Sequence, residues 1–197
     1  MTKLKSIYLA LLNRGEKIMR KKEIVKLVED YNNKIEKISI TNAIWYLSRQ
    51  NYIKRIFLGY YYINSYDEKK RSFCNYSDRE LIFSILNKEK VRWYLGLNTA
   101  IYEQGKTWQT PNRINIINTR ISGRRKIVGL NVKFIKIKED LVFGLKELKT
   151  NNKVPYFYSD PAKTYIDMVY FKQVKVLTRV KNTQEYLKRY PKWVGKK

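Results

Sequence analysis

The stretch that decides the fold is residues 38–63, ISITNAIWYLSRQNYIKRIFLGYYYI. Its first half has the 3.6-residue apolar spacing of an amphipathic helix. The residues expected to face inward are Ile40, Ala43, Ile44 and Leu47. Its second half holds two β-rich runs, 52–57 and 60–63, on either side of Leu58-Gly59, which predicts a β-hairpin. The stretch therefore predicts a short helix that leads directly into a hairpin.

Two further helices are predicted upstream of this stretch. Apolar residues recur at helical spacing through residues 4–12, and Gly15 follows as a C-cap. A second apolar stripe runs through residues 21–31. Three short helices followed by a hairpin are the layout of a winged helix-turn-helix, which we assign to residues 1–68.

Residues 69–197 are predicted to form a second domain of mixed helices and strands, after a polar linker at 64–71. Ser77 and Glu80 form a capping-box pattern before an apolar helix. We expect further helices at 91–104, 160–171 and 183–190. Alternating residues predict strands within 113–137, around a turn at 122–125, and another at 156–158. The predicted fold class is α+β, an N-terminal winged helix-turn-helix followed by a mixed α/β C-terminal domain.

The charge of the chain points to a polyanionic partner. Forty-two Lys and Arg against 17 Asp and Glu give a net charge of +25 over 197 residues, and such self-repulsion favours nucleic acid as the partner. An anionic membrane surface is the second candidate. A membrane span is not expected, because the longest apolar runs are far shorter than the roughly 18 residues needed. The apolar part of the first 17 residues is too short for a signal peptide and lacks a cleavage site.

Cysteine and histidine usage restricts the chemistry. Cys74 is the single cysteine and there is no His, so an intrachain disulfide and the usual zinc ligand sets are excluded. A reducing, cytoplasmic location fits this composition. No cofactor or metal is expected.

The outward face of the helix in residues 38–63 carries groups suited to the major groove. A wheel at 100° per residue places Asn42, Trp45, Tyr46 and Arg49 outward, with Thr41 at the edge. Asn and Arg can pair with adenine and guanine edges, and Thr offers a hydroxyl and a methyl group. Alternatively, Trp45 packs against the second domain or a partner protomer, because large surface aromatics often mark protein interfaces.

Phosphate contacts are expected from the residues around this helix. Ser39, a good N-cap, stands at its start. The cations assigned to phosphates in this domain are Arg20, Lys21, Lys22, Lys54 and Arg55.

In the second domain we expect a further basic contact. Arg120, Arg124, Arg125 and Lys126 are predicted to cluster at the turn near residue 122. From Lys172 onward, nine Lys and Arg oppose only Glu185. These cations either contact the DNA backbone or another anionic partner such as tRNA, or form a solvated face.

The second domain contains few residue patterns that are typical of a catalytic site. Glu147-Leu148-Lys149 matches the E-x-K half of a nuclease metal site, but Mg²⁺ would need another carboxylate from a neighbouring strand. Asp140 is the nearest upstream acid and stands in a turn-like context. Asp160, followed by Pro161, is interpreted as a helix cap rather than a catalyst. We therefore expect no enzyme, with a Mg²⁺-dependent nuclease as the competing hypothesis.

The order of motifs resembles the AbiEi family of antitoxins. The resemblance covers nearly the whole chain and is carried by residues 94–101 (YLGLNTAI), 109–111 (QTP) and 159–167 (SDPAKTYID). The chain departs from the family at Ala162, where an acid is common, and at Asn98, where an aromatic is common. The resemblance implies a winged-helix regulator without enzymatic activity that binds inverted repeats in its own promoter. It also implies a nucleotidyltransferase-like toxin that the antitoxin opposes, usually without a stable complex.

The predicted function is thus a sequence-specific DNA-binding autorepressor that acts as the antitoxin of a toxin–antitoxin pair. Its partner is double-stranded DNA, as an inverted-repeat operator that takes two protomers. A regulator of the same fold without a toxin partner is a third hypothesis beside the nuclease.

Overall fold

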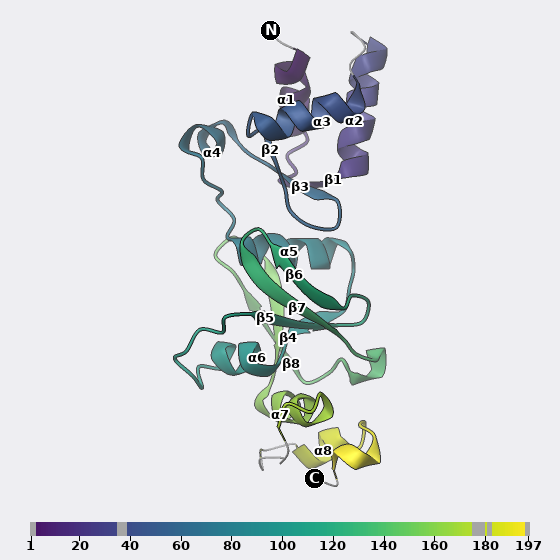
Figure 1. The fold of residues 1–197 in the computed structure, drawn as a ribbon, viewed down its shortest axis with the longest axis vertical. Helices are drawn as coiled ribbons and strands as arrows, with labels where there is room; N and C mark the ends of the chain where they lie inside the picture. The colour runs from purple at the N-terminus through teal and green to yellow at the C-terminus, as the bar shows by residue number, and fades with distance from the viewer. Residues whose placement is uncertain (1–2, 35–38, 175–179, 181–182, 196–197) are drawn as a thin grey trace. The chain divides into compact units, whose positions relative to one another are not determined.

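The computed structural model describes residues 3–34, 39–174, 180 and 183–195. The chain divides into two compact units, unit 1 (Met1–Ile85) and unit 2 (Leu86–Lys197), and each mixes helices with strands (Figure 1). The α+β class is as predicted. The division falls within helix α5 (Asp78–Lys88), further along the chain than residue 68.

Unit 1 contains the predicted helices and hairpin in the predicted order. The helices are α1 (Lys3–Asn13), α2 (Lys21–Lys34) and α3 (Ile40–Arg49), and the hairpin strands are β2 (Ile53–Arg55) and β3 (Tyr60–Ile63). Gly15 follows α1 with a φ of 69°, and its amide bonds back to Leu12 at 2.9 Å. A short strand that we did not foresee, β1 (Ile18–Arg20), pairs with β3, so the antiparallel sheet has the order β1-β3-β2.

The core of unit 1 lies between the three helices and the sheet. Its buried members come from α1, α2, α3, β1, β2 and β3, among them Leu11, Ile24 and Ile53. From α3, Ala43, Ile44 and Leu47 are buried, and Ile40 packs against the core. The predicted inward face of α3 is therefore confirmed.

The hairpin turn holds a strained residue. Leu58 and Gly59 have φ angles of 51° and 76°, and two left-handed central residues are typical of a type I′ turn. Glycine adopts this conformation without cost, but leucine does not. The Gly59 carbonyl accepts a hydrogen bond from the Lys21 amide at 2.7 Å, which ties the turn to the start of α2.

The segment predicted as a linker is instead helix α4 (Tyr66–Arg71). Ser65 and Glu68 form a capping box at its start. Glu68 is buried and also accepts hydrogen bonds from Lys17 Nζ at 2.7 Å and from the Tyr62 hydroxyl. A buried carboxylate, rather than an apolar face, anchors this polar helix.

Unit 2 is built on a mixed sheet with the order β6-β7-β5-β4-β9-β8. The strands are β4 (Trp93–Leu95), β5 (Ile114–Asn118), β6 (Gly123–Ile127), β7 (Leu130–Lys136), β8 (Leu145–Lys149) and β9 (Pro155–Ser159). The helices are α6 (Leu97–Glu103), α7 (Pro161–Tyr170) and α8 (Thr183–Leu187), with 3₁₀ turns η1 (Glu139–Leu141) and η2 (Lys192–Val194). Helices α6 and α7 pack on one face of the sheet through a core that includes Tyr94, Ile117 and Ile166 (Figure 1).

Three expectations for unit 2 need correction. Residues 91–104 are not one helix, because 93–95 form the buried strand β4 and Gly96 separates it from α6. A Cβ at Gly96 would lie 2.3 Å from Ile117 Cδ1, so a larger residue would require the buried Ile117 side chain to move. The turn lies at Val128-Gly129, with φ angles of 42° and 94°, while residues 123–125 belong to β6. Strand β8 was not foreseen.

Other expectations for unit 2 are confirmed. Asp160 Oδ1 accepts a hydrogen bond from the Lys163 amide at 2.8 Å and caps α7, with Pro161 as the first helical residue. Helix α8 begins at Thr183 as predicted and ends at Leu187. Across the described part of the chain, every helix is too short or too polar to span a bilayer.

Candidate nucleic-acid interface

The outward face of α3 is the centre of the candidate interface. Its members are all exposed: Thr41, Asn42, Trp45, Tyr46 and Arg49. The side chains of Trp45 and Tyr46 are 50% and 42% exposed, respectively. Because the opposite face of the same helix is buried in the core, the helix holds these side chains on a fixed surface of unit 1.

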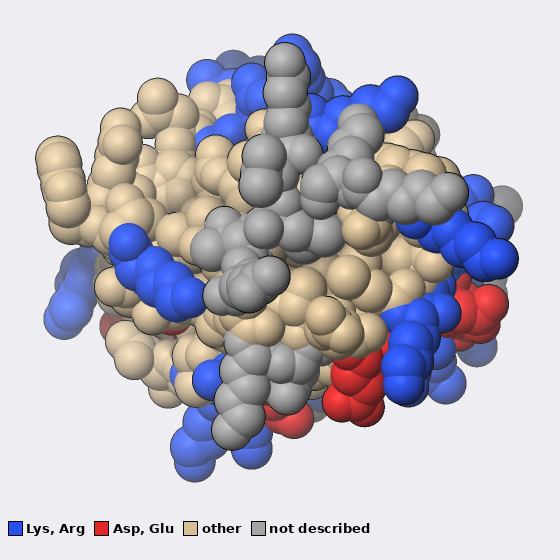
Figure 2. All heavy atoms as spheres, turned by 90° about the horizontal axis from the view of Figure 1, so that it is seen from below, with Lys and Arg blue, Asp and Glu red and all other residues tan. Residues whose placement is uncertain are grey.

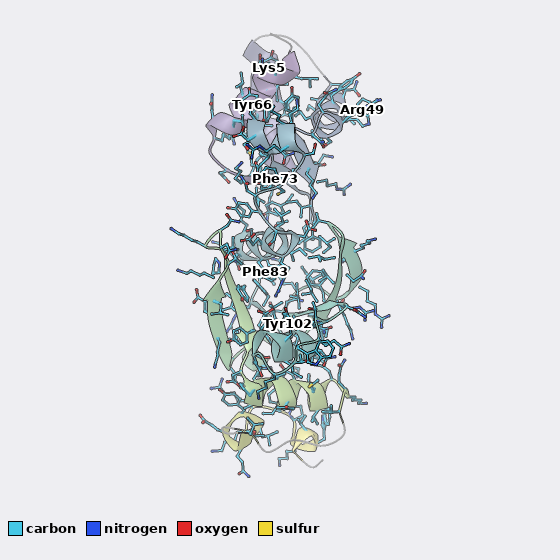
Figure 3. The ribbon with its side chains drawn as sticks, turned by 90° about the vertical axis from the view of Figure 1, so that its left-hand side faces the viewer. Lys5, Arg49, Tyr66, Phe73, Phe83 and Tyr102 are labelled. Atoms are coloured by element: carbon cyan, nitrogen blue, oxygen red, sulfur yellow. The ribbon has the colours of Figure 1, made fainter. Side chains whose placement is uncertain are left out.

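Three of these side chains form one cluster. The rings of Trp45 and Tyr46 meet edge to face with centroids 4.7 Å apart, and the Arg49 guanidinium lies 4.9 Å from the centroid of the Trp45 ring. In Figure 3, Arg49 lies at the periphery of unit 1. A guanidinium carries its N–H donors in a rigid fork and can lie against an aromatic ring while these donors bond elsewhere. The cluster therefore presents a large apolar surface with a fork of hydrogen-bond donors beside it.

Ser39 stands at the start of the same helix. It occupies the N-cap position, and its carbonyl accepts the Ala43 amide at 2.8 Å, but its side chain makes no capping bond. The side-chain cap predicted for Ser39 is therefore not formed. Ser39 is exposed at the start of the helix, where backbone amides favour anions.

The hairpin and the start of α2 supply the adjacent cations. Lys54 and Arg55 are exposed on β2, and Lys54 Nζ lies 3.8 Å from Asp78 Oδ1 in a half-exposed pair, which is a weak interaction. Lys21 and Lys22 are exposed in the first turn of α2. Because the Lys21 amide bonds to the Gly59 carbonyl, the start of α2 lies beside the hairpin turn.

Arg20 differs from its neighbours because it is braced against the hairpin. Its Nε donates to the Tyr60 hydroxyl at 2.7 Å, and its guanidinium lies 5.3 Å from the Tyr60 ring centroid. It is only partly exposed. Arg20 therefore positions the hairpin as well as adding positive charge.

In unit 2 the predicted basic cluster lies along an edge strand. Arg124, Arg125 and Lys126 are exposed on β6, whereas Arg120 donates to the Glu89 carbonyl at 3.2 Å and pairs with its carboxylate at 3.7 Å. Charged residues on an edge strand also discourage pairing with another chain. Figure 2 shows Lys and Arg around much of the rim of the face seen there. Five of the nine cations in the basic C-terminal segment lie outside the described residues, within 175–179, 181–182 and 196–197.

The sequence reading missed a buried polar cluster in unit 2. Lys163 Nζ lies 2.5 Å from Asp167 Oδ1 and 2.8 Å from the Tyr94 hydroxyl, and it also bonds to the Tyr190 hydroxyl. Asp167 accepts in turn from Tyr94 at 2.8 Å and from Tyr190 at 2.5 Å. The signal in the sequence is a Lys and an Asp four residues apart on a mostly apolar helix.

The environment of this cluster indicates a structural role rather than a catalytic one. Burial lowers the pKa of Lys163 and raises the pKa values of Tyr94 and Tyr190, since each charged form loses water. Lys163 and Asp167 are both fully buried. The cluster therefore ties β4, α7 and the C-terminal region together without access for a substrate.

The acidic candidates are dispersed. Glu147 and Lys149 are exposed on the edge strand β8, and Asp140 lies in η1. Asp160 is occupied as the cap of α7 and accepts a second bond from the Tyr186 hydroxyl at 2.7 Å. Within the residues that the structure describes, no three Asp, Glu, Cys or His side chains gather as metal ligands.

The resemblance to AbiEi-type antitoxins stays a prediction. A scan of protein-family models and a search of curated proteins found no match to this chain.

Proposed function

We propose that this protein is a transcription regulator whose unit 1 binds double-stranded DNA as a winged helix-turn-helix. The observation that carries the proposal is the two-sided character of α3. Its inner residues are buried in the core of unit 1, while Asn42, Trp45, Tyr46 and Arg49 stand exposed on the other side. In helix-turn-helix proteins such a helix lies in the major groove.

Four of the exposed residues have distinct roles in this proposal. Asn42 pairs with the N6 and N7 atoms of an adenine, and Arg49 with the O6 and N7 atoms of a guanine. The apolar edge of Trp45 contacts a thymine methyl group or braces a second protomer. Thr41 contacts bases near the start of the helix.

Phosphate contacts come from the edge formed by α2 and the hairpin. Lys21, Lys22, Lys54 and Arg55 are exposed there, and such contacts fix the register of a protein on the duplex without reading sequence. If six phosphates are neutralised, log K falls with log salt concentration at a slope of about −5. A slope near zero on the preferred site would refute this part of the proposal.

The autorepressor and antitoxin roles rest on the AbiEi resemblance and on the geometry of helix-turn-helix dimers. Two protomers on an inverted repeat in the protein's own promoter would give autorepression. A neighbouring gene for a nucleotidyltransferase-like toxin, whose growth inhibition this protein relieves on co-expression, would support the antitoxin role. Growth inhibition that persists on co-expression would refute the antitoxin role, and the proposed role would then be that of a transcription regulator only.

The test of DNA reading begins with selection of the preferred duplex from a random pool. The affinities of Asn42→Ala and Arg49→Ala are then compared on the selected site and on random DNA by fluorescence anisotropy. Each variant should lose roughly 1–3 kcal/mol on the selected site and relax the preference at one base pair. Matched controls are Asn13→Ala and Arg71→Ala, which alter exposed residues that belong to other helices, α1 and α4. An equal loss on selected and random DNA would contradict base reading.

A further inference from the structure

Unit 2 contains a groove that the DNA-binding proposal does not use. It has a volume of about 660 Å³, within the range of roughly 300–1,000 Å³ that is usual for ligand sites. Its floor is the sheet, with Asn115 from β5 and with Asn131 and Lys133 from β7. Asn115 and Lys133 are register partners and therefore share a face of the sheet. Helix α6 and the loop that follows it, residues 107–113, form the walls.

The lining of the groove is polar and carries positive charge. Eight of the twelve lining residues are Asn, Gln or Thr, and two are the cations Arg113 and Lys133, while none is acidic. Amide side chains pair with the donor and acceptor edges of bases, and cations pair with phosphates. The lining therefore fits a ligand that has both neutral hydrogen-bonding groups and negative charge.

The loop that forms one wall of this groove carries an exposed indole. Trp108 is 92% exposed, and its neighbours Thr107 and Gln109 both line the groove. A tryptophan that is this exposed contributes little to the core. Flat aromatic side chains beside a basic groove are the platforms on which unpaired bases stack.

A line of cations continues from the groove along the sheet. Arg124 on β6 is the register partner of Lys133, and Lys126 is the partner of Asn131, so these side chains lie on the face that forms the floor. Like charges directly opposite each other destabilise a strand pair. A polyanion along this line would relieve the repulsion between Arg124 and Lys133.

We propose that this groove binds a short single-stranded segment of RNA. Trp108 stacks on one base, the amides pair with the edges of the bases, and Arg113, Lys133 and Arg124 hold phosphates. RNA is favoured over DNA because the excess of amide and hydroxyl groups matches the 2′-hydroxyls that RNA adds to each nucleotide. This activity is separate from duplex recognition by α3 and does not depend on it.

The test measures binding of fluorescein-labelled octauridylate, which cannot pair with itself, to the full chain by fluorescence anisotropy. Trp108→Ala should weaken binding by about 5- to 150-fold, the loss expected for one stacked base. Lys133→Gln should weaken binding and reduce the salt slope by about 0.7, the value for one phosphate on a single strand.

Two matched variants separate the groove from the general basic charge. Lys146→Gln removes a cation from β8, at the other edge of the sheet, and Trp45→Ala removes an exposed indole from unit 1. Both should bind octauridylate as the unaltered protein does, although Trp45→Ala should bind duplex DNA less tightly. Such a result would show that the two activities are distinct.

Two outcomes would overturn the proposal. If Trp108→Ala and Lys133→Gln bind octauridylate as tightly as the unaltered protein, the groove is not the site. If octathymidylate DNA binds as tightly as octauridylate and responds equally to both changes, the groove does not select RNA.

Discussion

Glu68 offers the sharpest test of how unit 1 is held together. Its buried carboxylate accepts from Lys17 Nζ at 2.7 Å, from the Ser65 amide at 2.7 Å and from the Asn75 amide at 2.9 Å, and also from the Tyr62 hydroxyl. Burial opposes ionisation of this carboxyl group. The hydrogen bonds outweigh that effect and lower the pKa of Glu68 from 4.5 to about 2. We predict that Glu68→Gln destabilises unit 1 strongly at neutral pH and only weakly in acid.

The magnitude follows from the two pKa values. A carboxyl group with a pKa of 4.5 unfolded and about 2 folded contributes about 3 kcal/mol to the free energy of unfolding at pH 7. Because the folded pKa is depressed, this contribution is complete above the unfolded value and is lost as the pH falls from about 4.5 towards 2. At pH 3 about 2 of these 3 kcal/mol are already lost.

The assay is urea unfolding of the unaltered protein and of Glu68→Gln at pH 7 and pH 3. At pH 7 the midpoint of the variant should be lower by about 1.5 M, for a denaturant slope of about 2 kcal/mol per M. At pH 3 the two free energies of unfolding should differ by only about 1 kcal/mol. Asp67→Asn, at an exposed position of the same helix, is the control. A difference of the same size at both pH values would refute the reasoning.

The remaining predictions concern unit 2, the hairpin and catalysis. Asp167→Asn leaves the buried Lys163 ammonium without its counter-charge and should lower the free energy of unfolding in urea by about 3–5 kcal/mol. Lys163→Met combined with Asp167→Leu should lower it by less. Equal losses for the single and the double variant would contradict this prediction. Leu58→Gly removes a leucine from a backbone position in the left-handed region and should raise the free energy of unfolding by up to about 1 kcal/mol. A lower free energy of unfolding in the variant would count against backbone strain at the turn. Plasmid DNA with Mg²⁺ should stay intact, and cleavage that Glu147→Ala abolishes would establish the nuclease instead.

The surface of α3 could be predicted because its signal is local. One apolar residue pattern at helical spacing determines both which residues enter the core and which remain outside, and the structure buries Ala43, Ile44 and Leu47 as expected. The aromatic cluster of Trp45, Tyr46 and Arg49 could not be predicted, because a wheel gives directions but no rotamers.

The errors arose where the signal was ambiguous or distant. The short apolar run at 93–95 fits a buried strand as well as a helix, and only its pairing with β5 and β9 decides between them. Helix α4 looked like a linker because its anchor is Glu68, a charged residue that is normally exposed. Lys163 and Tyr190 are 27 residues apart, and the groove residues come from several elements, so neither site forms a pattern along the chain.

The most direct test of the central claim, that the exposed face of α3 reads bases, is a coupling measurement across the interface. Each adenine of the selected site is replaced in turn by 7-deazaadenine, which lacks the N7 acceptor, and binding to the unaltered protein and to Asn42→Ala is compared. Base reading by Asn42 predicts one adenine at which the replacement weakens the unaltered protein by about tenfold but does not weaken the variant further. If the loss of binding free energy from the base replacement and the loss from Asn42→Ala add independently at every adenine, base reading by Asn42 is contradicted.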